Sequence, residues 1–183
     1  MTARTIPTLP TWTAGARILA ANLAAMVAYQ QFFANPPMFR MYQTVAQSVA
    51  DSAFTQITCD TSDKDSDTGR GGSTPWSYTI PVGMTGEWVF TYKTAWASNV
   101  TGSRTAELYV NGVVANGTNV FVPALTGGLA SFAVGLGRSV KVNAGDVIGL
   151  YGRQTSGGAL NTVVASAGDY SFFEGRLISL ASP

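Results

Sequence analysis

The chain contains no histidine and only one cysteine, Cys59, among its 183 residues. The absence of histidine removes the most common general base, the most common zinc ligand and any Ser-His-Asp triad. Cys59 cannot form a disulfide within the chain and lacks its usual activating partner, so we expect a buried thiol. A hydrolase with paired carboxylates stays open, but no acidic residues converge in the pattern. We therefore predict that the protein is not an enzyme and carries no cofactor.

Charge is also scarce, because charged residues make up 11% of the chain and the formal net charge is +1. Nucleic acids and anionic membranes attract clustered lysine and arginine, so we expect neither as a partner. The most apolar stretch, residues 18–29, is too short to span a bilayer, which predicts a soluble product made in the cytoplasm. Few charges, 46% hydrophobic residues and 20 glycines are typical of a β protein that covers much of its surface with other subunits.

The N-terminal region predicts an extended arm followed by a helix. Pro7 and Pro10 remove backbone donors from the arm and fix its φ angles. Residues 16–34 are strong helix formers, and an apolar seam recurs at spacings of four and three through Leu19, Leu23, Met26, Gln30 and Phe33. Asn-Pro-Pro at 35–37 ends the helix. Because so short a helix is marginal alone, it packs on its own β domain, bundles around a three-fold axis or docks on a partner.

Residues 38–53 are interpreted as an extended connector. The chain is thereby divided into an anchor region, residues 1–53, and a β domain, residues 54–183. Within the β domain hydrophobicity alternates with period two, and Asn111-Gly112 between two apolar pairs predicts a type I′ hairpin. Short strands, frequent turns and the lack of a helical pattern predict an all-β antiparallel jelly-roll sandwich.

Aromatic residues at strand positions form the largest group of candidate contact residues. The candidates for the core or for an interface between subunits are Trp88, Phe90, Tyr92, Phe172 and Phe173. A second set has the ring size and polar edge to stack on a sugar: Trp76, Trp96, Tyr151 and Tyr170. We favour the core or interface interpretation for this second set too, because aromatic residues in strands more often pack there.

An acidic run offers a weak candidate for a calcium site. Asp63, Asp65 and Asp67 alternate as in calcium loops, where hard oxygen ligands must converge on one cation. The following glycine, Gly69, lies one residue further along than an EF-hand loop requires, and Lys64 places a positive charge between the acidic residues. We favour a solvated loop held by Asx turns, and we predict no metal site.

The order of motifs over residues 54–181 resembles the jelly-roll superfamily of tumour necrosis factor and the complement globular heads. The stretches that carry the resemblance are residues 78–83 with 88–90, the hairpin at 108–112, the Gly-Asp turn within 142–150 and the final strand at 170–178. The resemblance implies a homotrimer in which aromatic and aliphatic faces meet at the three-fold axis.

A second resemblance covers residues 1–42. Trp12-Thr-Ala-Gly15, the alanine-rich helix and Asn35-Pro-Pro-Met38 look like the opening of small virion proteins from tailed phages, especially those of actinobacteria. In these proteins a docking segment precedes a trimeric head.

Together the two resemblances imply a bacteriophage virion structural protein made in the host bacterial cytoplasm. Residues 1–53 would bind a major capsid protein or a tail protein, and the trimeric jelly-roll would face outward as a capsid decoration protein. The alternative is a minor tail protein that binds a host receptor or a surface glycan.

Overall fold

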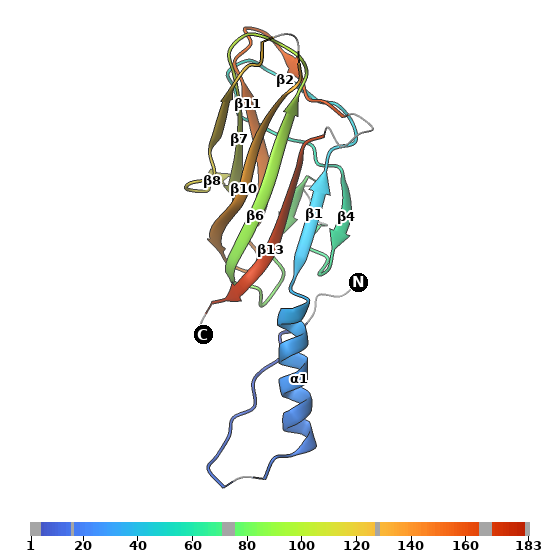
Figure 1. Cartoon of the computed structure of the whole chain (residues 1–183), viewed down its shortest axis with the longest axis vertical. Helices are drawn as coiled ribbons and strands as arrows, with labels where there is room; N and C mark the ends of the chain where they lie inside the picture. Colours follow the sequence, from blue (N-terminus) through green and yellow to red (C-terminus); the bar gives the residue numbers. More distant parts are fainter. Residues whose placement is uncertain (1–4, 16, 71–75, 127–128, 165–169, 182–183) are drawn as a thin grey trace.

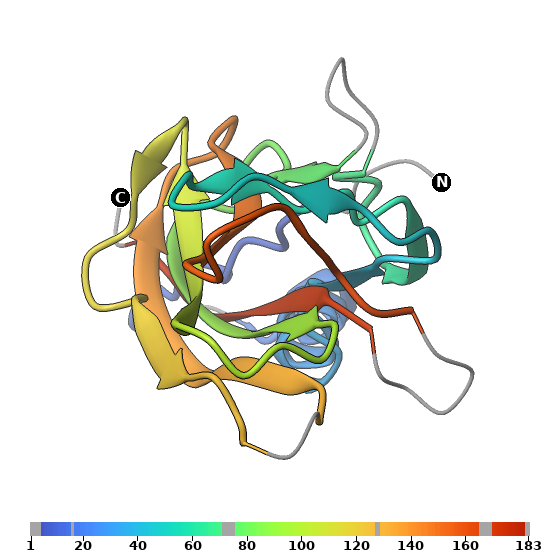
Figure 2. The ribbon, with the colours of Figure 1, turned by 90° about the horizontal axis from the view of Figure 1, so that it is seen from above.

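A computed structural model describes residues 5–15, 17–70, 76–126, 129–164 and 170–181. A β sandwich forms the body of the molecule, and one helix projects from its end (Figure 1). Viewed along the long axis, the strands enclose the core from both sides (Figure 2). The named strand pairs are all antiparallel.

The first sheet has five strands in the order β10-β6-β13-β1-β4. Their bounds are Ser131–Val142 for β10, Gly86–Trp96 for β6, Phe172–Leu180 for β13, Met38–Tyr42 for β1 and Thr61–Asp65 for β4. The strand β13 lies between β6 and β1, so the last described strand of the chain pairs with the first. This arrangement makes the sheet depend on contacts between residues far apart in the sequence.

The second sheet has the order β3-β11-β7-β8, and β5 and β9 also pair with it, on β11 and β7 respectively. The bounds are Thr55–Gln56 for β3, Ser77–Thr79 for β5, Ser103–Val110 for β7, Val113–Val114 for β8, Val120–Pro123 for β9 and Val147–Gln154 for β11. A separate two-stranded pair joins β2, Ser48–Val49, to β12, Leu160–Asn161.

The core lies between the two large sheets and is rich in aromatic rings. From Gly86 to Thr94 every second residue of β6 is buried, as the alternating sequence predicts, and the last two residues of the strand are buried as well. Trp88, Phe90 and Tyr92 are fully buried in this way. Their polar atoms are paired, since the Trp88 Nε1 donates to the Met84 carbonyl oxygen at 3.1 Å and the Tyr92 hydroxyl donates to the Thr118 carbonyl oxygen. The core therefore contains no unsatisfied donor at these two rings.

The predicted hairpin is present between β7 and β8. Asn111 and Gly112 have φ angles of 52° and 78°, and Val110 pairs with Val113 across the turn. Two consecutive positive φ values are what a type I′ turn requires, and asparagine followed by glycine adopts them at little cost.

Residues 38–53 differ from the expected connector. Met38–Tyr42 forms β1, whose Phe39 and Met41 are buried in the core, and Ser48–Val49 forms β2. The segment Met-Phe-Arg-Met-Tyr alternates like a strand, with Arg40 on the opposite face from its two buried neighbours. The β sandwich therefore begins at residue 38 rather than at residue 54.

The helix α1 spans Ala20–Ala34, so residues 17–19 of the helix predicted for 16–34 are not helical, and residue 16 lies outside the described residues. Its first cap residue, Leu19, offers no side-chain hydrogen bond to the free N–H groups of the first turn. The C-terminal end agrees with the prediction, since Asn35 is the cap and Pro36 follows. No described helix is long and apolar enough to cross a membrane.

Candidate assembly interface

The outward face of the five-stranded sheet carries a cluster of aromatic and cationic side chains. Strand alternation places these residues opposite the core, where Tyr42 and Phe172 pair across β1 and β13, and Lys93 of β6 pairs with Phe172. The Tyr42 and Tyr170 rings lie 5.2 Å apart between centroids. All four side chains are half-buried in the isolated chain.

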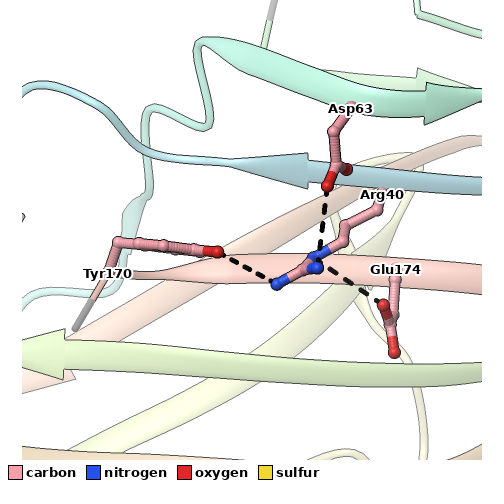
Figure 3. A network of polar contacts seen from close by, with 4 residues as sticks. All are labelled: Arg40, Asp63, Tyr170 and Glu174. Carbon is pink, nitrogen blue, oxygen red and sulfur yellow. Dashed lines mark hydrogen bonds and ion pairs between the residues drawn. The ribbon is translucent and has the colours of Figure 1, made fainter. Parts of the chain in front are cut away.

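Arg40 is the hub of a polar network on this face (Figure 3). Its Nη2 donates to the Tyr170 hydroxyl at 3.1 Å, its Nη1 lies 3.6 Å from Asp63 Oδ2, and its Nε lies 3.9 Å from Glu174 Oε2. The network joins β1, β4 and β13. Because all three charged side chains are partly open to water, each ion pair contributes little stability in the isolated chain.

Two cations lie over aromatic rings in the same cluster. The Arg40 guanidinium carbon is 5.1 Å from the Phe172 ring centroid. The Lys93 ammonium lies 5.2 Å from the Phe132 centroid and 5.6 Å from the Phe172 centroid. Aromatic rings with arginine are enriched at the cores of protein interfaces, and a cation over a ring gains strength when a partner excludes water.

Aliphatic side chains extend this face toward the sheet edge. Leu136 of β10 exposes 70% of its surface, and Val134 on β10 and Ile178 on β13 are also exposed. Single exposed apolar residues are common on protein surfaces. These three, however, lie on the same sheet face as the aromatic cluster and enlarge it. The face combines the features of a surface that is buried on assembly.

The helix is the second candidate contact surface. It contains no charged residue, and Phe32 is its single buried residue. Of the predicted seam, Leu19 and Leu23 are exposed, while Met26 and Phe33 are half-buried. Figure 1 shows the helix pointing away from the sandwich, with the arm beside it. The sequence left open whether the helix packs against its own sandwich. In the structure only the last turn of the helix does so.

The five predicted core or interface residues divide between two locations. Trp88, Phe90, Tyr92 and Phe173 are fully buried between the sheets, whereas Phe172 lies on the outward face. Adjacent residues of one strand point to opposite sides, so Phe172 and Phe173 cannot share a location. Arg40 was not among the residues predicted from the sequence, although its place between two apolar residues of an alternating segment was a usable signal.

The acidic run forms strand β4 and the turn after it, rather than the expected solvated loop. Asp63 pairs with Arg40, Asp65 accepts the Gly69 N–H at 3.0 Å, and Asp67 is buried. The Asx-type bond of Asp65 agrees with the expected turn chemistry. In the described part of the chain, no group of three potential metal-ligating side chains comes together.

The predicted sugar-stacking aromatics lie apart from one another. Trp96 is fully buried, Tyr170 belongs to the Arg40 network, and Trp76 is 37% exposed beside β5. Tyr151 lies on the outward face of the second sheet, stacked on Tyr109 with ring centroids 3.9 Å apart. Tyr109 was not among the site residues predicted from the sequence, because the sequence does not show which strand pairs with β7.

The single thiol lies in the core. Cys59 is fully buried, and its burial raises the thiol pKa far above its ordinary value. A buried neutral thiol is a poor nucleophile, in agreement with the sequence interpretation.

Solved structures share this architecture. The globular domain of zebrafish complement 1qA protein is similar with a TM-score of 0.55 and 14% identity, over 80% of this chain and 100% of that chain. Eiger TNF from S. frugiperda is similar with a TM-score of 0.58 and 9% identity, over 81% of this chain and 97% of that chain. The fold is a TNF/C1q-like jelly-roll.

The same jelly-roll occurs in a vertex protein. PRD1 vertex protein P5 is similar with a TM-score of 0.52 and 16% identity, over 78% of this chain and 97% of that chain. No protein-family model and no curated protein sequence matches the chain. The likeness thus rests on three-dimensional structure, and it confirms the predicted fold class.

Proposed function

We propose that the chain is a non-enzymatic structural protein of a tailed-phage virion, a homotrimer held by its N-terminal region and displayed on the head as a capsid decoration protein. The observation that carries the proposal is the uncharged helix that projects from the sandwich and leaves Leu23 52% exposed. An isolated helix of this length is marginal in water, so it needs a protein surface around it. A likeness to PRD1 vertex protein P5 supports a place in a virion.

The trimer would bury the outward face of the five-stranded sheet and the exposed side of the helix. The aromatic and aliphatic residues on that face match the faces that the tumour necrosis factor resemblance places at a three-fold axis. The arm and helix would then reach a major capsid protein or a tail protein. Because the sandwich begins at β1, we propose residues 1–34 as the anchor in place of residues 1–53.

Light scattering on the purified full chain tests the trimer. We expect a trimer mass that falls at low protein concentration, because association couples to stability by mass action. A double change of Leu23 and Val27 to serine should shift the protein towards monomer. Val100→Ser, an equally exposed valine in the loop after β6, is the matched control. A full chain that stays monomeric at all concentrations contradicts the trimer.

Cryo-electron microscopy of purified virions, labelled with an antibody against the folded chain, tests the location. Labels spread over the head support the decoration protein. Labels confined to the tail support the minor tail protein that binds a host receptor or glycan. Unlabelled particles contradict the virion proposal.

A further inference from the structure

A small hollow opens on the outward face of the second sheet, away from the candidate assembly interface. It has a volume of about 230 Å³ and is lined by residues that include Gln56, Ser77, Tyr109, Asn111, Gly149 and Tyr151. These residues come from β3, β5, β7 and β11 and from the Asn-Gly hairpin. Pockets for drug-sized ligands span about 300–1,000 Å³, so this hollow has room for a single small ring.

Gly149 forms part of the floor of the hollow. Gly149 pairs with Tyr109 across β11 and β7. A Cβ atom at this position would lie 3.1 Å from Gln56 Nε2 and 3.2 Å from a Tyr151 ring carbon, tighter than ordinary contact. Glycine inside a strand weakens it and often marks the close approach of another group. Here the glycine lets the Gln56 amide and the Tyr151 ring lie close to the strand backbone.

The tyrosine pair gives the hollow a rigid aromatic wall. Tyr109 and Tyr151 stack with 3.9 Å between centroids and 23° between ring planes, and Phe54 lies 6.4 Å from Tyr109. Burial raises the pKa of the Tyr109 hydroxyl, and the nearby Glu107 carboxylate raises it further, so this ring stays neutral. A stacked ring that is already held in place loses little entropy when a ligand binds.

Amide groups at the rim provide directional hydrogen bonding. Asn111 is fixed, because its Nδ2 donates to Asp146 Oδ1 at 2.7 Å and its Oδ1 accepts the Val147 N–H at 2.9 Å. The Gln56 Nε2 donates to the Trp76 carbonyl oxygen at 3.5 Å, a long bond that a better acceptor can replace. None of the lining residues carries a charge.

We infer that this hollow binds one neutral hexopyranose residue of a glycan. The apolar C–H face of the sugar would lie on the face of the Tyr151 ring that is not stacked on Tyr109, and its hydroxyl groups would bond the Gln56 amide. None of the lining residues is cationic, so the carboxylate of a sialic or uronic acid would lose water there without a cationic partner in the lining, and Arg153 lies outside it, over the Phe54 ring. The inference does not depend on trimer formation or on a place in the virion.

Saturation-transfer NMR on the full chain tests the inference directly. The probes are the methyl glycosides of glucose, galactose and mannose, each offered at millimolar concentration. We expect saturation to reach the ring C–H protons of at least one probe. Tyr151→Ala should weaken its binding about tenfold, because the ring contact is lost. Gln56→Ala should weaken binding and leave the aromatic wall intact.

Phe121→Ala is the matched control, because Phe121 is an exposed aromatic residue on β9 outside the hollow. Circular dichroism establishes that each variant is folded, and Tyr151→Phe, which keeps the ring, should retain binding if Tyr151→Ala fails to fold. The inference is overturned if the wild-type chain transfers saturation to none of the three probes. It is also overturned if transfer is unchanged when the Tyr151 ring and the Gln56 amide are both removed.

Discussion

Replacing Phe39 by alanine tests whether β1 belongs to the core. Phe39 is 1% exposed, stacks on Tyr78 with 3.6 Å between ring centroids, and meets Phe173 edge-on at 5.4 Å. Removing a buried phenyl ring costs about 3–5 kcal/mol, from lost burial and from the cavity that is left. Two ring contacts place the expected loss of unfolding free energy at about 4 kcal/mol. A chain of this size should then melt about 8–16 °C lower.

Urea denaturation followed by tryptophan fluorescence measures this loss. Protein concentration must be the same for each variant, because assembly would make the midpoint depend on it. Val45→Ala is the control, since Val45 lies in the same segment and is 65% exposed, and its effect should stay within about 0.5 kcal/mol. A loss below about 1 kcal/mol for Phe39→Ala would refute the placement of β1 in the core and restore residues 38–53 as a connector.

Three further outcomes follow from the packing. Gly175→Ala should lower the unfolding free energy by about 1–3 kcal/mol, because the added Cβ would lie 2.6 Å from the Phe39 ring in the core. Gly158→Ala is the control in the same denaturation assay and should have almost no effect, because a Cβ there meets no atom within 4 Å. The Cys59 thiol should react with a thiol reagent only after denaturant is added, and fast labelling of the native chain would contradict its burial. Arg40→Met should change the unfolding free energy by less than about 1 kcal/mol at protein concentrations where the chain is monomeric, because its ion pairs are partly solvated there, and a loss above about 3 kcal/mol would argue against that exposure.

Alternation and turn chemistry made β6 and the β7–β8 hairpin predictable. Trp88, Phe90 and Tyr92 repeat with period two, and their rings all point into the core. Asn111-Gly112 specifies a type I′ turn through the φ angles of these two residues alone. Both features are local, so no knowledge of distant partners was needed.

The strands β1 and β4 were harder to predict, because they are short and carry charges. Arg40, Asp63 and Lys64 break the apolar run that marks a buried strand, and β4 has no fully buried residue. These strands form because β13 offers β1 a partner from the far end of the chain. The Arg40 network that results brings together residues from positions 40 to 174, a combination that no local window contains.

By itself, the sequence determined which residues turn inward along β6, where the Asn-Gly turn falls and that the helix carries no charge. These properties depend on the backbone and on neighbouring residues. Only the tertiary structure decided that β1 lies between β13 and β4, that the helix projects from the sandwich and that Tyr109 stacks on Tyr151. Backbone hydrogen bonds are chemically alike in every strand, so the choice of partner rests on how all the side chains pack at once.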